Sequence, residues 1–196
     1  FFTDSRYIEA AQAAVTGAQV ELVDRAHPMH ARIRAVLEAE GAKAVGAEER
    51  WLSHAAWERL CKSTERTLQA GQSVPDTLRQ SKDDEELAAL RAAQRITDET
   101  FADMLNILRP GMTEQEAAAE LVYRMLRRGA ERVSFDPIVV SGERSSMPHG
   151  VPGQRALRDG DFVTMDFGCV YQGYCSDMTR TVAIGHATDE MQQVYY

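Results

Sequence analysis

One segment indicates both the fold and the chemistry of this chain: Asp161-Phe-Val-Thr-Met-Asp166-Phe-Gly168-Cys-Val-Tyr-Gln-Gly173-Tyr-Cys-Ser-Asp177-Met-Thr-Arg-Thr181. Residues 162–167 and 173–184 show the alternation of β-strands, and the residues between them favour a turn, so the segment predicts a hairpin. A two-residue turn centred on Tyr171 and Gln172 would place Asp166 directly opposite Asp177. Residues in such a pair point to the same face of the sheet, with Cβ atoms about 4.5–5.5 Å apart. A different loop length would slide the pairing by a residue or two.

Two ionised carboxylates so placed need a compensating partner. At roughly 5 Å and an effective dielectric constant of about 20, their repulsion costs about 3 kcal/mol. A shared proton would relieve it and raise the pKa of one carboxyl. Arg180 is close in sequence but points to the other face of the strand from Asp177. A divalent cation held by both aspartates is the third solution, and carboxylate oxygens suit Mn²⁺, Co²⁺ or Zn²⁺.

The alternative to a metal site is that Asp166 and Asp177 are solvated or hydrogen-bonded aspartates on the two strands. Two carboxylates are also fewer ligands than the three or more protein ligands that transition-metal sites usually have. Thr179 shares a face with Asp177, so it is either a hydrogen-bond donor to this pair or an ordinary strand threonine.

His149 is the candidate for proton transfer. Pro148 and Gly150 flank it and predict a loop, and loops on a rigid scaffold often carry chemistry. A histidine there can donate to a substrate carbonyl or move a proton. The alternative is an ordinary surface histidine.

The first 81 residues alternate strand and helix signals and predict a small α/β unit. The stretch 69–82 is poor in apolar residues and contains Gly71 and Pro75, so a domain boundary is expected near Lys82. The strands expected before it are 1–3, 18–23 and 43–46, and the helices are 7–15, 29–40 and 53–60.

Residues 82–196 predict two amphipathic helices followed by antiparallel strands, which is an α+β fold. Ser81 is expected to cap the first helix, and Pro110 to end it. Thr113 and Glu116 match the capping box of a second helix, which Gly129 closes.

Composition excludes several classes of protein. The net charge is −8, with 22 Lys and Arg against 30 Asp and Glu, and no basic stripe of the kind that nucleic-acid binders carry is visible. No apolar run approaches the roughly 18 residues of a membrane span. The three cysteines include no Cys-x-x-Cys pair, which favours reduced thiols and a cytoplasmic protein. Cys169 and Cys175 flank the expected turn, and both are expected to be buried thiols rather than metal ligands.

Several motifs resemble a known family in their order and spacing. They are Ser134-Phe-Asp-Pro-Ile-Val-Val-Ser-Gly142, Pro148-His149-Gly150, Gly160-Asp161, Asp166-Phe-Gly168, Gly173-Tyr174 and Ser176-Asp-Met-Thr-Arg-Thr181. Together they resemble the Xaa-Pro peptidases, aminopeptidase P and prolidase, of the pita-bread metallopeptidase family. Arg79-Gln-Ser-Lys82 likewise resembles the family's junction between its N-terminal and catalytic domains.

The resemblance implies the following expectations. Residues 1–81 would be the later part of an N-terminal creatinase/prolidase-like α/β domain, and 82–196 the first half of the pita-bread catalytic domain. Such enzymes hold two divalent ions, commonly Mn²⁺ or Co²⁺, and Asp166 and Asp177 match two of the metal ligands. His149 matches a catalytic histidine outside the metal shell. The substrates would be peptides with proline at the second position, and family members often form homodimers.

The resemblance also predicts an incomplete site. The family's metal-binding histidine and two glutamates would lie beyond residue 196, and both chain ends look cut, so residues 1–196 alone are expected to bind metal weakly and hydrolyse nothing. Three alternatives remain open: a methionine aminopeptidase-like enzyme, a metal-free creatinase-like hydrolase, and a non-catalytic scaffold that binds protein partners.

Overall fold

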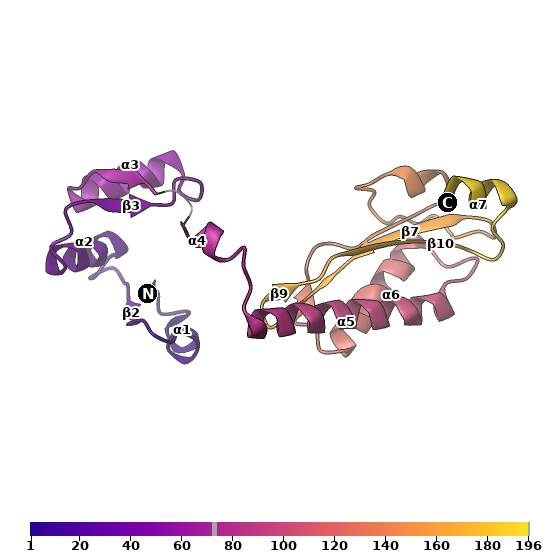
Figure 1. Ribbon diagram of the computed structural model, residues 1–196, viewed down its shortest axis with the longest axis horizontal. Helices are drawn as coiled ribbons and strands as arrows, with labels where there is room; N and C mark the ends of the chain where they lie inside the picture. The colour runs from indigo at the N-terminus through magenta and orange to yellow at the C-terminus, as the bar shows by residue number, and fades with distance from the viewer. Residues whose placement is uncertain (72–73, 196) are drawn as a thin grey trace. The chain divides into compact units, whose positions relative to one another are not determined.

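Two units make up the chain in the computed structural model, which describes residues 1–71 and 74–195 (Figure 1). They span Phe1–Ser81 and Lys82–Tyr196, and the exposed residues 79–83 connect them. None of the described helices combines the length and the apolar character that crossing a bilayer requires.

The first unit contains short parallel strand pairs and helices, as its alternating signals predict. β1 pairs with β2, and β3 with β4. Ser53 caps α3 by accepting a hydrogen bond from the Ala56 N–H at 3.2 Å. β4 and α4 fall in or beside a stretch for which the sequence predicts no element. The bounds are β1 Phe2–Thr3, α1 Ile8–Ala14, β2 Glu21–Leu22, α2 Met29–Ala39, β3 Val45–Ala47, α3 His54–Thr64, β4 Leu68–Ala70 and α4 Val74–Leu78.

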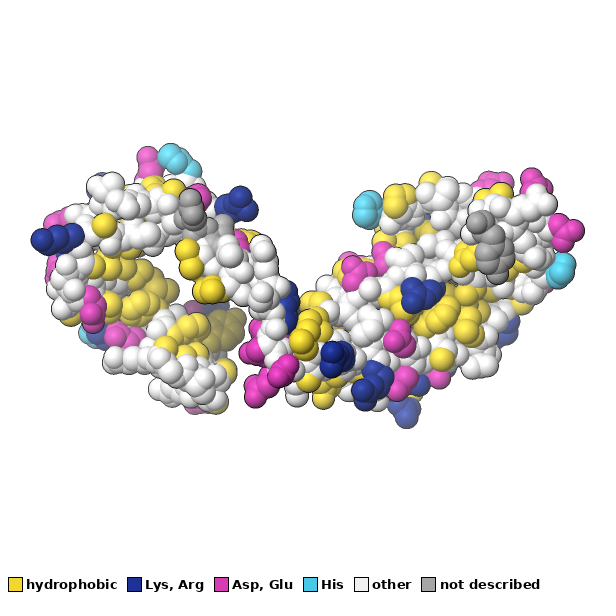
Figure 2. Space-filling model, in the orientation of Figure 1, with side chains coloured by type: hydrophobic (Ala, Val, Ile, Leu, Met, Phe, Trp, Pro, Cys, Tyr) yellow, Lys and Arg dark blue, Asp and Glu magenta, His cyan; other side chains and the backbone are white. Residues whose placement is uncertain are grey.

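Two capped helices open the second unit. α5 covers Asp84–Ile107, and its N-cap is Asp83 rather than the predicted Ser81, because Asp83 and Glu86 close a capping box with each other's backbone N–H groups. Figure 2 shows the acidic side chains gathered where α5 begins, which is the end of a helix that favours negative charge. α6 covers Glu114–Arg127, and the predicted capping box of Thr113 and Glu116 is confirmed.

Short antiparallel strands follow and form two three-stranded sheets, with orders β10-β7-β6 and β5-β8-β9. β7 continues into β8 after a one-residue break at Gly168, and β9 continues into β10 after a break at residues 176–177. The α+β prediction is confirmed. The bounds are β5 Arg132–Val133, β6 Ile138–Ser141, the 3₁₀ helix η1 Gly142–Ser146, β7 Phe162–Phe167, β8 Cys169–Tyr171, β9 Tyr174–Cys175, β10 Met178–Ala183 and α7 Asp189–Tyr195.

The core of this unit lies between the sheet and the two long helices. The odd-numbered side chains of β7, Val163, Met165 and Phe167, are fully buried and belong to one cluster with apolar residues of α5 and α6. Because side chains alternate along a strand, Thr164 and Asp166 lie on the opposite face of β7, away from the helices. The strand pattern therefore decides which face is left for polar chemistry.

Candidate functional site

Asp166 lies on the polar face of the central strand β7. Its cross-strand neighbours are Ile138 on β6 and Thr179 on β10. The Thr179 hydroxyl donates to Asp166 Oδ1 at 2.9 Å, so this threonine is a hydrogen-bond partner of the carboxylate. Two residue pairs further along, on the same face, the Thr164 and Thr181 hydroxyls lie 3.0 Å apart.

The predicted register of the hairpin is wrong by two residues. The turn is centred on Gln172 and Gly173, whose φ angles are 49° and 79°, and Val170 pairs with Cys175. Positive φ at both central residues is the type I′ arrangement, whose twist matches that of paired strands. Asp166 consequently lies opposite Thr179, and Asp177 is its diagonal neighbour, at a typical separation of about 7–8 Å.

Asp177 nevertheless shares the polar side of the sheet. Burial alternates strictly along the chain here: Ser176 and Met178 are buried, whereas Asp177 and Thr179 are exposed. The Ser176 hydroxyl contacts Thr97 Oγ1 on α5 at 2.5 Å, so residue 176 points toward the helices. Asp177 therefore points away from them, to the side on which Asp166 lies.

The backbone before Asp177 is held by close packing at Gly168. A Cβ on Gly168 would lie 2.6 Å from Ser134 Oγ and well inside van der Waals contact with the Ser176 carbonyl oxygen. Ser134 Oγ donates to that carbonyl at 2.9 Å, and the Cys169 N–H donates to Ser176 Oγ at 3.0 Å. The Gly168 position thus lets the two strands approach closely just where Asp177 leaves the ladder.

Neither aspartate has a cationic partner within the described ranges. Arg180 Nη1 donates to the Thr179 carbonyl oxygen at 2.8 Å instead, and Arg180 pairs with the buried Met165, which places it on the predicted other face. Asp177 is exposed, and no group of three or more candidate metal-ligating side chains occurs in the described part of the chain. Two hard carboxylate donors without a cation fit part of a divalent-metal site, and they fall short of a complete one.

The loop that carries His149 lies over the same face. A Cβ on Gly150 would be 2.5 Å from Val140 Cγ1, so the backbone at residue 150 rests directly on that side chain. Val140 pairs with Thr164, and paired residues share a face. His149 itself is exposed. The fold therefore brings the loop to the polar side of the sheet that carries Asp166, while His149 makes no described contact with either aspartate.

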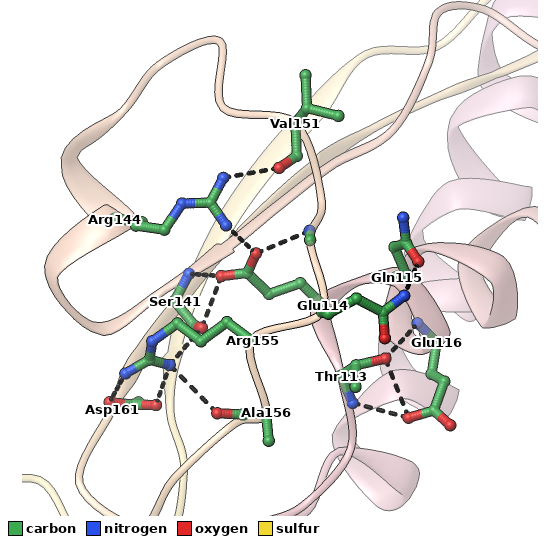
Figure 3. Close-up of polar contacts among 12 residues, drawn as sticks. Thr113, Glu114, Gln115, Glu116, Ser141, Arg144, Val151, Arg155, Ala156 and Asp161 are labelled. Atoms are coloured by element: carbon green, nitrogen blue, oxygen red, sulfur yellow. Dashed lines mark hydrogen bonds and ion pairs between the residues drawn. The ribbon is translucent and has the colours of Figure 1, made fainter.

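A buried ionic network behind this loop was missed by sequence analysis (Figure 3). Its centre is Glu114, the fully buried first residue of α6. It accepts hydrogen bonds from Ser141 and ion-pairs with Arg144. An acid in the first turn of a helix looks like an ordinary partner of the helix dipole, so the sequence carries no local signal for this role.

Arg155 and Asp161 form the second half of the network. Arg155 Nη1 lies 2.6 Å from both Ser141 Oγ and Asp161 Oδ2, and Nη2 donates to Asp161 Oδ1 at 3.0 Å. The hydrogen bonds from Arg155 hold the pKa of the Asp161 carboxyl below its usual value, with the Arg158 backbone N–H contributing. Asp161 therefore stays ionised and fixes the strand-side end of the loop.

Of the predictions for Cys169 and Cys175, one is confirmed and one is wrong. Cys169 is buried, as expected, and its Sγ lies 3.5 Å from the Ala93 carbonyl oxygen. Cys175 is exposed, so the prediction that it is a buried thiol is wrong. It lies on the solvent-exposed side of the two-residue strand β9.

Comparison with known proteins agrees with this architecture. The model of metallopeptidase family M24 matches residues 88–196. An uncharacterized peptidase of Bacillus subtilis, YqhT, is 37% identical over 198 residues, which cover 100% of this chain and 55% of that protein. The chain thus spans about half the length of the curated relatives it matches.

Solved structures show the same similarity. An Xaa-Pro dipeptidase from Bacillus anthracis superposes with a TM-score of 0.92 at 34% identity, covering 99% of this chain and 54% of that one. An X-Pro aminopeptidase from Thermotoga maritima superposes with a TM-score of 0.89 at 33% identity, covering 99% and 55%. The fold is therefore the pita-bread fold over about half of its length, and the chain belongs to metallopeptidase family M24.

Proposed function

We propose that this chain contributes the first metal ligands and the catalytic histidine of a dinuclear-metal-dependent Xaa-Pro peptidase. The observation that carries the proposal is the placement of Asp166 and Asp177 on one side of the β7–β10 pair, with no cationic side chain between them in the described structure. Two relatives with solved structures are an Xaa-Pro dipeptidase and an X-Pro aminopeptidase, which supports peptides with proline at the second position over other peptides.

Each residue has a separate role in the proposal. Asp166 and Asp177 would hold divalent cations, of which Mn²⁺ and Co²⁺ suit the oxygen donors. When bound, such cations activate water and polarise a carbonyl group. The Thr179 hydroxyl, at 2.9 Å from Asp166 Oδ1, fixes the orientation of that carboxylate. His149 would donate a proton or a hydrogen bond to the substrate near the scissile bond.

The domain assignment is part of the same proposal. Residues 1–81 would belong to a creatinase/prolidase-like N-terminal domain, and residues 82–196 to the first half of the catalytic domain. Coverage of 54–55% of the relatives supports further ligands, a histidine and two glutamates, outside residues 1–196. A cytoplasmic homodimer that cleaves peptides with proline at the second position completes the proposal.

The first test uses residues 1–196 alone. Isothermal titration calorimetry with Mn²⁺ should show only weak binding, because two carboxylates form an incomplete site. Incubation with an Xaa-Pro dipeptide and with an Xaa-Pro tripeptide should give no cleavage. Measurable Mn²⁺-dependent turnover by this chain would refute the need for further ligands.

The second test uses a full-length protein of the relatives' size. Asp166→Asn and Asp177→Asn should each remove bound metal, measured by mass spectrometry of the metals, and abolish activity. Asp98→Asn is the matched control, because Asp98 is an exposed acid on α5. Full metal content in either site variant would contradict the assigned ligands.

A third comparison separates His149 from the metal ligands. His149→Ala should lower kcat by about 100-fold or more, the usual range for losing a general acid or base, and leave the metal content unchanged. His186→Ala, an exposed histidine elsewhere, should behave as wild type. The two Xaa-Pro substrates would also distinguish dipeptidase from aminopeptidase activity, and preferential cleavage of a Met-Ala peptide would replace the Xaa-Pro assignment.

A further inference from the structure

Glu114 is a buried carboxylate whose contacts all lead to one loop. Its Oε1 accepts hydrogen bonds from the Ser141 N–H at 2.9 Å and the Ser141 hydroxyl at 2.8 Å. Its Oε2 accepts from the Gly153 N–H at 3.0 Å and ion-pairs with Arg144. The Glu114 side chain is fully buried, whereas that of Arg144 is 33% exposed. Removing a buried polar group from water is costly unless its hydrogen bonds are replaced, and these four contacts engage both carboxylate oxygens of Glu114.

These contacts fall at the beginning and the end of the loop that carries His149. The chain leaves β6 at Ser141, runs through η1, and returns to the start of α6, where the Glu114 N–H donates to the Arg155 carbonyl oxygen at 3.1 Å. One carboxylate of α6 therefore binds the last residue of β6, a residue of η1 and Gly153 in the returning segment (Figure 3).

Arg144 extends the anchor to the immediate surroundings of His149. While Nη1 faces Glu114, Nη2 donates to the Val151 carbonyl oxygen at 2.7 Å. His149 lies in the segment between Arg144 and Val151, and the Arg144 guanidinium group links the two ends of that segment. Within the segment the Met147 N–H donates to the Arg144 carbonyl oxygen at 2.9 Å, and the Gly150 N–H donates to that of Met147 at 3.2 Å.

We propose that Glu114 is a positioning residue for His149: through Arg144 and the two loop ends it holds the histidine over the polar face of the sheet. The inference rests on the proposed function of His149, and it adds a residue that touches neither substrate nor metal. Displacement of a catalytic group by about 1 Å lowers rates by about 100-fold, so the anchor should affect turnover rather than metal binding.

The test compares Glu114→Gln with Glu116→Gln in the full-length protein. Both variants remove one negative charge from the first turn of α6, but within the described residues the hydrogen bonds of the Glu116 side chain go to the Thr113 cap and not to the loop. Glu114→Gln should lower kcat by about 10- to 100-fold and leave KM and metal content near wild type. Glu116→Gln should leave all of them unchanged.

Hydrogen exchange supplies a readout that does not depend on catalysis. The amides of Met147 and Gly150 should exchange about 10- to 100-fold faster in Glu114→Gln, the range expected when a charge-assisted hydrogen bond is lost. Gly153 is a poor reporter, because its amide is itself bonded to Glu114. Arg144→Ala, at the partly exposed end of the anchor, is the second variant if Glu114→Gln does not fold, and it should accelerate the same two amides.

A double-mutant comparison separates this inference from the proposed function. In the His149→Ala background, Glu114→Gln should lower kcat by less than about 2-fold, because residues that act as a unit are not additive. If the two substitutions lower kcat additively, the role of Glu114 is overturned and the proposed function is not. The same holds if the amides of Met147 and Gly150 exchange at the wild-type rate in Glu114→Gln while His149→Ala remains inactive. Wild-type turnover in His149→Ala would instead overturn the proposed function, while the exchange rates would still report whether Glu114 anchors the loop.

Discussion

At the scale of single residues, Gly168 is required by space and not by backbone conformation. Its φ lies outside the left-handed region, so alanine could adopt the backbone angles. A Cβ, however, would collide with the carbonyl of Ser176 and the hydroxyl of Ser134. The Ser176 carbonyl belongs to the backbone, and the Ser134 hydroxyl is hydrogen-bonded to it. Neither group can move aside without separating the two strands.

Gly168→Ala should therefore lower the free energy of unfolding by about 3 kcal/mol, the upper end of the range for overpacking. Gly111→Ala is the control, because a Cβ there meets nothing within 4 Å and φ is +89°. That variant should lose only about 1 kcal/mol from left-handed strain. Urea denaturation of both measures the difference, and equal losses would show that the contact with Ser176 is not limiting.

Asp161 makes the stability of the second unit sensitive to acid. Its pKa is lowered first by the hydrogen bonds from Arg155, and its side chain is only 12% exposed. A carboxyl whose pKa is lower in the folded state than in the unfolded state stabilises the fold. The stabilisation is complete when the pH is above the ordinary pKa of 3.8. This contribution disappears as the pH falls through the lower pKa of the folded state.

Asp161→Asn should remove that dependence. At pH 7 the variant should be less stable by about 1.5–3 kcal/mol, the range for hydrogen bonds to charged groups. As the pH falls below the ordinary value of 3.8, the two proteins should converge. Thermal unfolding between neutral and acidic pH gives this comparison, and a constant gap down to the lowest pH would contradict the assigned cause.

At the scale of elements, the hairpin between β8 and β9 sets the position of Asp177. Its type I′ turn places a non-glycine residue, Gln172, at φ 49°. Asparagine followed by glycine is the preferred sequence for this turn, because asparagine tolerates positive φ better than glutamine does. The strand pairing evidently selects the turn in spite of this local penalty.

Gln172→Asn should accordingly raise the free energy of unfolding by about 0.5 kcal/mol or more, within the usual range for improved local conformation. Gln172 is exposed, so the substitution changes no core packing. Gly173→Ala, at φ 79° with open space around the site, should have the opposite sign. A loss of stability in Gln172→Asn would indicate a role of the glutamine side chain beyond the turn.

At the scale of the whole molecule, the two units differ in how much apolar surface they bury. Among described hydrophobic residues of the first unit, Ala11 and Leu68 are buried, whereas α2 buries none. The second unit contains the continuous cluster around Met165 and Phe167. Since apolar burial is the dominant favourable term in folding, the second unit should be the more resistant to local opening.

Limited digestion with trypsin tests this difference. Arg79 and Lys82 lie in the exposed connection, and cleavage after them should leave a persistent fragment that begins at Gln80 or Asp83 and retains α5 to β10. The first unit should be degraded at least about 10-fold faster, as expected if the opening free energies differ by about 1.4 kcal/mol. Mass spectrometry identifies the fragments, and equal survival of both units would contradict the difference in burial.

Local sequence signals were sufficient to predict most helices and strands. They were insufficient to predict the residues that hold the site in place. The alternation in 162–167 predicts β7, and the Thr113–Glu116 spacing predicts the start of α6, because both depend on neighbours in sequence. The N-cap of α5 was misplaced by two residues, because Ser81 and Asp83 are both good caps and the reciprocal bond with Glu86 decides between them. Glu114 could not be identified at all, since its partner Ser141 lies 27 positions away.

The sequence by itself determined the strand and helix types, the polar and apolar faces of β7, and the identity of Asp166, Asp177 and His149 as the candidate residues. Periodicity and motif spacing are properties of neighbouring residues, so they can be read without coordinates. Only the tertiary structure decided the hairpin register and the contact that holds Asp177 on the side predicted for it. That side is set by Ser176, which contacts Thr97 on α5 from 79 positions away, and a contact between distant residues leaves no trace in local sequence.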